Sequence, residues 1–259
     1  DDKINNLYTA KNIDIDSFLS KIKKDARLQS KIMHYAIVTK PGSGAETSKA
    51  MIINTENNKF ILAKEYLMPN NIFYYENAYK SLPSNEKLFG LADSLTHAWE
   101  SFGSPIKNNF VNYLSKPIID CICNDVSNNQ ISPENFTQSS FFGGILQSDA
   151  ASGLTHAFAH SIEYKSNYNH AKLIFFSLPF AFTYWNLFSQ TNSLDNLFIK
   201  NANKIQLAHS KITALLSINE IKDFNALKKE LIGYNKTKII DDLLQDPCAR
   251  FTPKKLENE

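Results

Sequence analysis

Four of the six histidines in this 259-residue chain fall in two short stretches, together with an aspartate, at spacings suited to binding a metal ion. His156 and His160 are four residues apart in a segment rich in Ala, Leu and Phe, so we predict both rings on one face of a helix. Asp93 and His97 have the same spacing in an earlier apolar segment. An Asp with several imidazoles is a ligand set that suits a borderline divalent cation such as Fe²⁺ or Zn²⁺.

A further histidine, His170, follows a polar stretch of loop composition after this predicted helix. From spacing alone, a helical His pair also fits a packed or capped pair that binds no metal, so the metal hypothesis depends on two pairs and His170 together. One competing motif is disfavoured. The helical zinc proteases need His-Glu-x-x-His, whereas Ala157 follows His156 here.

The elements that must position these residues are predicted to be helical from Ser84 onward, with breaks near 103–105, 128–133, the loop before His170, and Asn192. The segment 173–188 is uncharged for sixteen residues. A membrane-spanning helix needs about 20 apolar residues, and this run also contains Pro179. We therefore expect a buried core helix and no membrane partner.

The first part of the chain is predicted to be mixed. Its pattern indicates a helix over 13–32, a strand over 34–39, a hairpin formed by 51–53 and 59–63, and a strand over 71–75.

Composition excludes several classes of protein. The net charge is +2 without a basic run, so nothing points to nucleic acid as a partner. Three cysteines are too few to indicate a disulfide framework, and the first residues contain no apolar core of a secretory signal. A cytoplasmic location is the expectation. Since the sequence begins with Asp1 and not Met, we expect a fragment, a processed product or a trimmed chain.

Five segments resemble motifs of the iron-containing (group III) alcohol dehydrogenases, in the same order and spacing over roughly residues 30 to 250. Gly90–Glu100, after Leu82-Pro83, is similar to the family's "GxDALTHAxE" block, and Gly144–His160 to its "AGxAxSNAxxGxxHAxAH" block. The other three segments are Thr39–Glu46 for "TTAGTGSE", His170-Ala171 for "PHG", and Asp246-Pro247-Cys248 for "DPC".

The resemblance implies a mainly α fold of dehydroquinate synthase-like architecture. Residues 1–80 would be a partial α/β nucleotide-binding domain, a small remnant of a dinucleotide-binding domain, and residues 81–259 an all-helical metal-binding catalytic domain. The implied metal ligands are Asp93, His97, His156 and His170. His160 would contact the substrate or relay a proton, although a packing role also fits it. Glu100 could lie behind the ligands or on a salt-bridged face.

The resemblance also implies NAD(P) as cofactor, with Thr39, Gly42, Ser43 and Gly44 helping to hold the nucleotide. On local sequence alone the two glycines favour a tight turn over a nucleotide contact, and Lys40 and Ala45 depart from the family's residues. The chain contains no GxGxxG or GGGS phosphate loop.

The implied function is a metal-dependent, NAD(P)-linked alcohol dehydrogenase or aldehyde reductase acting on a small-molecule alcohol or aldehyde, as a fragment or truncated member. Two alternatives stay open: a catalytically incomplete metal-binding module, and a metal-dependent lyase of the dehydroquinate-synthase type. A homodimer is the candidate assembly. Lys172 departs from the family's small or apolar residues and is a candidate contact for an anionic substrate.

Overall fold

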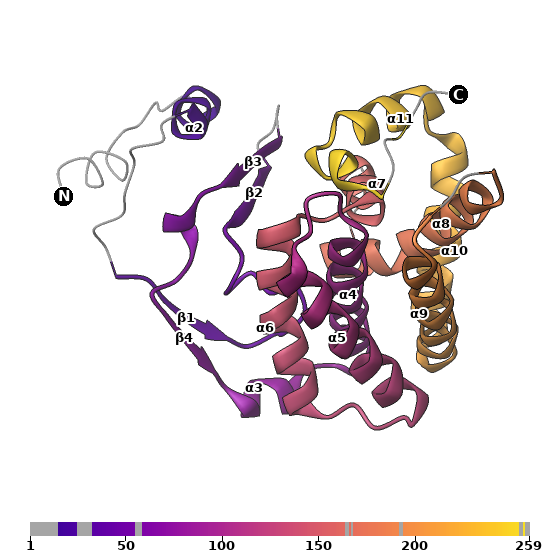
Figure 1. The fold of residues 1–259 in the computed structure, drawn as a ribbon, viewed down its shortest axis with the longest axis horizontal. Helices are drawn as coiled ribbons and strands as arrows, with labels where there is room; N and C mark the ends of the chain where they lie inside the picture. The colour runs from indigo at the N-terminus through magenta and orange to yellow at the C-terminus, as the bar shows by residue number, and fades with distance from the viewer. Residues whose placement is uncertain are drawn as a thin grey trace.

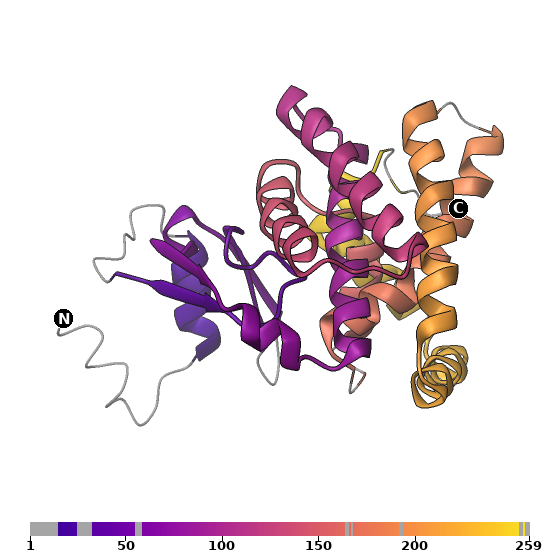
Figure 2. The same ribbon diagram turned by 90° about the horizontal axis from the view of Figure 1, so that it is seen from below.

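A computed structural model describes residues 15–24, 33–54, 59–163, 166, 168–191, 194–253 and 256. Figures 1 and 2 show the strands gathered at the amino-terminal end of the molecule and the helices packed beside them. The expectation of a mainly α fold is confirmed, and so are the predicted hairpin and the two single strands. Of the helix predicted over 13–32, the structure describes α2 (Ile15–Lys24), and the remainder lies outside the described residues.

The strands form two small sheets. β1 (Tyr35–Val38) pairs in parallel with β4 (Asn71–Tyr74), and β2 (Ala50–Asn54) pairs antiparallel with β3 (Lys59–Ala63). In the hairpin Ile52 lies opposite Ile61. The short helix η1 (Glu65–Leu67) connects β3 to β4. Helix α2 contacts β3, where Leu19 and Leu62 form a small buried cluster.

The helical region begins with α3 (Glu76–Ser81), which the sequence analysis did not predict, and continues with α4 (Ser84–Gly103), α5 (Asn109–Ser127) and α6 (Pro133–Ala150). Helix α4 is buried from Leu88 to Gly103 because α5, α6, α8 and α9 pack around it. Asn108 and Ser132 cap α5 and α6 by accepting backbone N–H groups of the first turn. The predicted domain boundary falls next to the end of α3, and it stays a prediction.

The site is completed by α7 (Leu154–Glu163) and α8 (His170–Thr191), followed by α9 (Asn196–Leu215), α10 (Ile218–Gly233), α11 (Lys236–Gln245) and the short helix η2 (Pro247–Phe251). The apolar run in α8 is largely buried against α4, α7 and α9, as expected of a core helix. Across the described ranges, every helix is too short or too polar to cross a membrane.

A loop between β1 and β2 joins the strand region to the helices. The Ser94 hydroxyl of α4 donates to the Gly42 carbonyl at 2.8 Å, and the Thr47 hydroxyl donates to the Phe141 carbonyl of α6 at 2.6 Å. These buried contacts place the loop next to the helices that carry Asp93 and His97.

Candidate metal centre and adjoining cavity

Helix α4 supplies the first two residues of the site. Asp93 and His97 are buried, with 1% and 2% of their surface exposed. Their i,i+4 spacing places Asp93 Oδ1 3.8 Å from His97 Nε2. A buried carboxylate therefore faces the interior of the helical region, beside an imidazole of the same helix.

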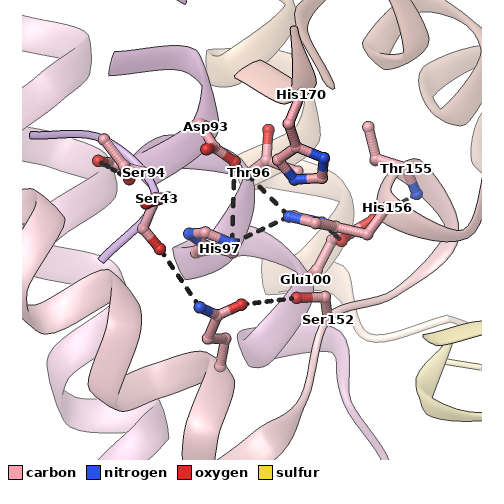
Figure 3. Close-up of polar contacts among 12 residues, drawn as sticks. Ser43, Asp93, Ser94, Thr96, His97, Glu100, Ser152, Thr155, His156 and His170 are labelled. Carbon is pink, nitrogen blue, oxygen red and sulfur yellow. Dashed lines mark hydrogen bonds and ion pairs between the residues drawn. The ribbon is translucent and has the colours of Figure 1, made fainter. Parts of the chain in front are cut away.

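Helix α7 adds His156 and His160 on one face, as the spacing predicted, with ring centroids 6.1 Å apart. His156 Nε2 lies 2.9 Å from His97 Nε2 and 3.6 Å from Asp93 Oδ1. Figure 3 shows the side chains of Asp93, His97, His156 and His170 converging from three helices.

His170, the first residue of α8, completes this cluster. Its ring centroid is 5.7 Å from that of His156. Ligand atoms of Asp93, His156 and His170 all lie within 4.8 Å of one another. The structure thus brings three of the four predicted metal ligands into one mutual group, and the fourth, His97, lies beside the group through its contacts with Asp93 and His156.

Glu100 lies directly behind His156 and is 5% exposed. Its Oε2 atom accepts from His156 Nδ1 at 2.6 Å and from the Gly153 N–H at 2.7 Å, while Oε1 accepts from the Thr155 N–H at 2.5 Å. The carboxylate therefore orients the imidazole and also anchors the amino-terminal end of α7, where negative charge is favourable. Of the two roles that the sequence left open for Glu100, the structure favours the one behind the ligands.

Charge in this cluster is distributed unevenly. Burial lowers the pKa of His97 to about 3, so this ring is neutral at pH 7. Burial also opposes charge on His156, but Glu100 and Asp93 outweigh it and raise the pKa of His156 to about 9. Burial would raise the pKa of Asp93, yet the neighbouring imidazoles, His97 first, hold that pKa below its usual range. His156 Nε2 lies 2.9 Å from His97 Nε2, and a hydrogen bond at this distance needs one proton between the two atoms. With His97 neutral and His156 charged, His156 Nε2–H donates to His97 Nε2.

The donor set fits a divalent cation. Among the described residues Asp93 Oδ1 has no hydrogen-bond partner although it is buried. His156 Nδ1 is bound to a carboxylate, which is the arrangement found behind metal-ligating histidines, and deprotonated Nε2 would then face the ion. One carboxylate oxygen and three imidazoles suit Fe²⁺ or Zn²⁺.

His160 lies beside both His170 and His156, with ring centroids 5.3 and 6.1 Å apart. Its Nδ1 atom is 3.0 Å from Asp246 Oδ2, and Asp246 Oδ1 caps η2 by accepting the Cys248 N–H at 2.9 Å. The Asp-Pro-Cys motif therefore closes the site by fixing the His160 ring. The sequence analysis recognised the Asp-Pro-Cys motif but assigned it no contact with His160, because nothing in the local sequence relates residue 246 to residue 160.

A cavity of about 500 Å³ opens onto the cluster. Its walls come from the β1–β2 loop, the β2–β3 hairpin, the end of α6, the α6–α7 connection and η2, and it is lined by His97, His156, His160 and His170. All four imidazoles therefore line one cavity large enough for a small organic ligand.

The residues predicted to hold a nucleotide lie on the β1–β2 loop. Thr39 is exposed, whereas Gly42 and Gly44 are buried with positive φ angles of 145° and 62°. A Cβ atom on Gly42 would lie 2.8 Å from the Gly90 Cα, and one on Gly44 would lie 2.3 Å from the Gly144 nitrogen.

The N–H groups of Gly42 and Gly44 both donate to the Ser140 Oγ, at 2.8 and 3.2 Å. The structure thus gives these glycines a turn and close packing against α4 and α6, and it commits their N–H groups to the protein. Ser43 is exposed and lines the cavity. Nucleotide contact by this loop stays a prediction.

Lys172 is buried and paired, in contrast to the suggestion that it meets an anionic substrate. Its ammonium group forms ion pairs with Glu220 and, at 2.7 Å, with Asp223 of α10. It is not among the residues that line the cavity at the histidines. The departure from small or apolar residues at this position is therefore explained by a salt bridge between α8 and α10.

Comparison with known proteins gives a consistent picture. No family model matches the chain. It is 28% identical over 153 residues to "Probable alcohol dehydrogenase EutG" of Escherichia coli K12, which covers 56% of this chain and 39% of the relative. It is 24% identical over 151 residues to the bifunctional aldehyde-alcohol dehydrogenase AdhE of the same organism, covering 55% and 17%. The chain spans well under half the length of these curated relatives.

Solved structures share the fold. An alcohol dehydrogenase from Oenococcus oeni superposes with a TM-score of 0.74 at 17% identity, over 97% of this chain and 68% of that one. An iron-containing alcohol dehydrogenase from Thermotoga maritima gives 0.69 at 16% identity, over 95% and 65%. The predicted resemblance is confirmed: the chain is similar in sequence to named alcohol dehydrogenases and has the fold of the iron-containing alcohol dehydrogenases.

Proposed function

We propose that this chain forms the metal-binding part of a NAD(P)-linked alcohol dehydrogenase or aldehyde reductase, with Fe²⁺ or Zn²⁺ held by Asp93, His97, His156 and His170. The observation that carries the proposal is the group of Asp93, His156 and His170, whose ligand atoms lie within 4.8 Å of one another; Asp93 and His156 are buried and His170 is half-buried. The named activity of the relatives supports the reaction class.

When bound, a divalent cation in this group would act as a Lewis acid toward the oxygen of an alcohol or aldehyde, while a nicotinamide would exchange hydride with the carbon. The protein's own residues prepare the site. Asp93 stays ionised and offsets positive charge, and Glu100 fixes the orientation of His156. His160, oriented by Asp246, lines the same cavity, which supports a role for it in contacting the substrate or passing a proton.

The nucleotide half of the proposal concerns the strand region. β1 and β4 form a two-stranded parallel sheet in which Tyr35, Ile37 and Phe73 are 57%, 67% and 53% exposed. Parallel sheets are normally covered on both faces. The exposed apolar faces support the proposal that residues 1–80 are part of a larger nucleotide-binding domain, and that Thr39, Gly42, Ser43 and Gly44 belong to its cofactor side.

The second candidate function is a metal-binding module that lacks redox activity by itself. Its support is that the 259 residues contain no GxGxxG or GGGS segment to bind a pyrophosphate. A lyase of the dehydroquinate-synthase type has less support, because the relatives and similar structures described above are named alcohol dehydrogenases.

The test is metal analysis with parallel NAD(H) and NADP(H) titration of the 259-residue chain, its His156→Ala variant and a His34→Ala control. His34 is exposed and outside the cluster. We expect one Fe²⁺ or Zn²⁺ per chain in the parent and the control, and a loss of at least tenfold in metal affinity in His156→Ala.

Metal together with nucleotide binding would support a dehydrogenase-competent chain. Metal without nucleotide binding would favour the module. No uptake of Fe²⁺ or Zn²⁺ by folded parent protein would refute the site.

A further inference from the structure

The β1–β2 loop brings a lysine to the cavity. Lys49 is half-buried and lines the cavity together with Ser43 and Ser48. Within the described ranges no carboxylate forms an ion pair with Lys49, whereas Lys40 pairs with Glu86. An ammonium group at the wall of a cavity, without an acidic partner among the described residues, favours an anionic ligand.

The backbone of Lys49 is fixed from both sides. Its N–H donates to the Ser148 Oγ of α6 at 3.0 Å, and its carbonyl accepts from the Lys64 N–H at 2.9 Å. The side chain therefore projects from a backbone position that α6 and the β2–β3 hairpin hold in place, which reduces the entropy lost when the ammonium group binds a ligand.

Two hydroxyls of the same loop, those of Ser43 and Ser48, line the cavity together with Lys49. The Ser43 Oγ accepts from the Ala45 N–H at 3.3 Å, and the Ser48 Oγ accepts from the Ala50 N–H at 3.1 Å. Both oxygens act as acceptors in these bonds, so each hydroxyl hydrogen remains free to donate to a ligand. A lysine with two serine hydroxyls is a donor set that suits carboxylate, sulfonate or phosphate oxygens.

The acidic residue of the cavity wall lies next to the metal-ligand cluster. Glu163 Oε1 is 3.6 Å from His170 Nδ1. The Gln147 amide connects the loop to the α6–α7 segment by donating to the Ser43 carbonyl at 3.3 Å and accepting from the Ser152 hydroxyl at 3.4 Å. Figure 3 shows Ser43 on the far side of His97 from His170. The cavity therefore has a donor-rich end at the loop and an imidazole-rich end at the cluster.

We propose that Lys49, with Ser43 and Ser48, forms an anion subsite for a ligand whose reacting oxygen lies at Asp93, His156 and His170. This inference rests on the proposed function and narrows its substrate class to alcohols or aldehydes that carry an anionic group. The same chemistry would suit the phosphates of a nucleotide, so the experiment must separate the two sources.

The experiment is calorimetric titration of the 259-residue chain, in low salt, with 3-hydroxypropanoate, its neutral analogue 1,3-propanediol, and ADP. The variants are Lys49→Met, Lys49→Arg and the control Lys222→Met, which removes an exposed lysine of α10. Circular dichroism confirms that each is folded. We expect Lys49→Met to weaken anion binding at least about tenfold, in line with the loss of a charged hydrogen bond. Lys49→Arg should keep binding within about threefold, and the control should not change it.

If the parent binds 3-hydroxypropanoate more tightly than both ADP and the diol, and this preference depends on Lys49, the subsite belongs to the substrate. If the Lys49-dependent preference is for ADP, the subsite belongs to the nucleotide, and the proposal that the substrate carries an anionic group is overturned. Equal anion binding by parent and Lys49→Met, or none by either, overturns the subsite. Repeating the titration with His156→Ala separates this result from the metal proposal, because the subsite is expected to bind anions in that variant even when metal is lost.

Discussion

Replacing Glu100 with Gln tests how far the residue behind the ligands controls the centre. The carboxylate accepts three hydrogen bonds, from His156 Nδ1, the Gly153 N–H and the Thr155 N–H, in a site that is 5% exposed. Glutamine keeps the shape, but it has one acceptor oxygen and places an NH₂ group against one of these donors. In the metal-free chain at pH 7, His156 is charged because its pKa is raised to about 9, so the substitution also removes its counter-ion.

Two magnitudes follow. Breaking a buried ion pair by removing one partner costs about 3–5 kcal/mol, and we expect Glu100→Gln to lower the free energy of unfolding by this amount without metal. Loss of a residue that orients a metal-ligating histidine typically lowers metal affinity about 10- to 100-fold. The assays are urea unfolding of the metal-free protein and Zn²⁺ competition against a chelator of known affinity.

The matched control is Glu134→Gln on α6, an exposed glutamate whose substitution should change stability by less than about 0.5 kcal/mol. If Glu100→Gln binds Zn²⁺ within threefold of the parent affinity and unfolds with unchanged free energy, the argument that Glu100 holds His156 for a metal is refuted.

Further predictions concern protons, backbone packing and the second carboxylate–histidine pair. Metal binding must release the proton of His156, so apparent Zn²⁺ affinity should rise about tenfold per pH unit from 7 to about 9. Because this pKa is raised above the ordinary 6.5, its stabilising contribution to the metal-free fold is complete below pH 6.5 and is lost as pH approaches 9. Urea unfolding against pH checks this sign, and a flat affinity profile would contradict it. Gly44→Ala should destabilise by more than about 2 kcal/mol, since its Cβ would overlap the α6 backbone, whereas Gly233→Ala, with open space around it, should be neutral or slightly stabilising. Asp246→Asn should change the tautomer balance of His160, visible in its ¹⁵N shifts while metal content stays constant; unchanged shifts would remove Asp246 from this role.

Helix placement could be predicted because it depends on local pattern. The i,i+4 spacing of Asp93 with His97 and of His156 with His160 fixed their faces, and apolar composition indicated the helical segments of α4, α7 and α8. The hairpin strands were equally predictable, because two short apolar runs, 51–53 and 59–63, flank a polar segment in the sequence. Helix α3 was missed because six residues carry too little periodicity to distinguish a short helix from a loop.

Motif residues with long-range partners could not be assigned from sequence. Lys172 looked available for a substrate, because nothing local indicates that α10 places two acids beside it. Gly42 and Gly44 indicated a tight turn in the local sequence, but their packing partners, Gly90 of α4 and Gly144 of α6, lie in other motifs. Close approach of two backbones needs glycine on both sides, and that requirement is visible only in space.

The sequence by itself determined the residue types of the centre, their helical faces and the mainly α class, since these follow from side-chain chemistry and a period of 3.6 residues. Tertiary structure alone decided which side chains meet. It placed Glu100 behind His156, Asp246 against His160, and Lys49 in the lining of the cavity that opens onto the cluster. These relations depend on how α4, α7, η2 and the β1–β2 loop pack, and packing is set by burial over the whole core, which no local pattern encodes.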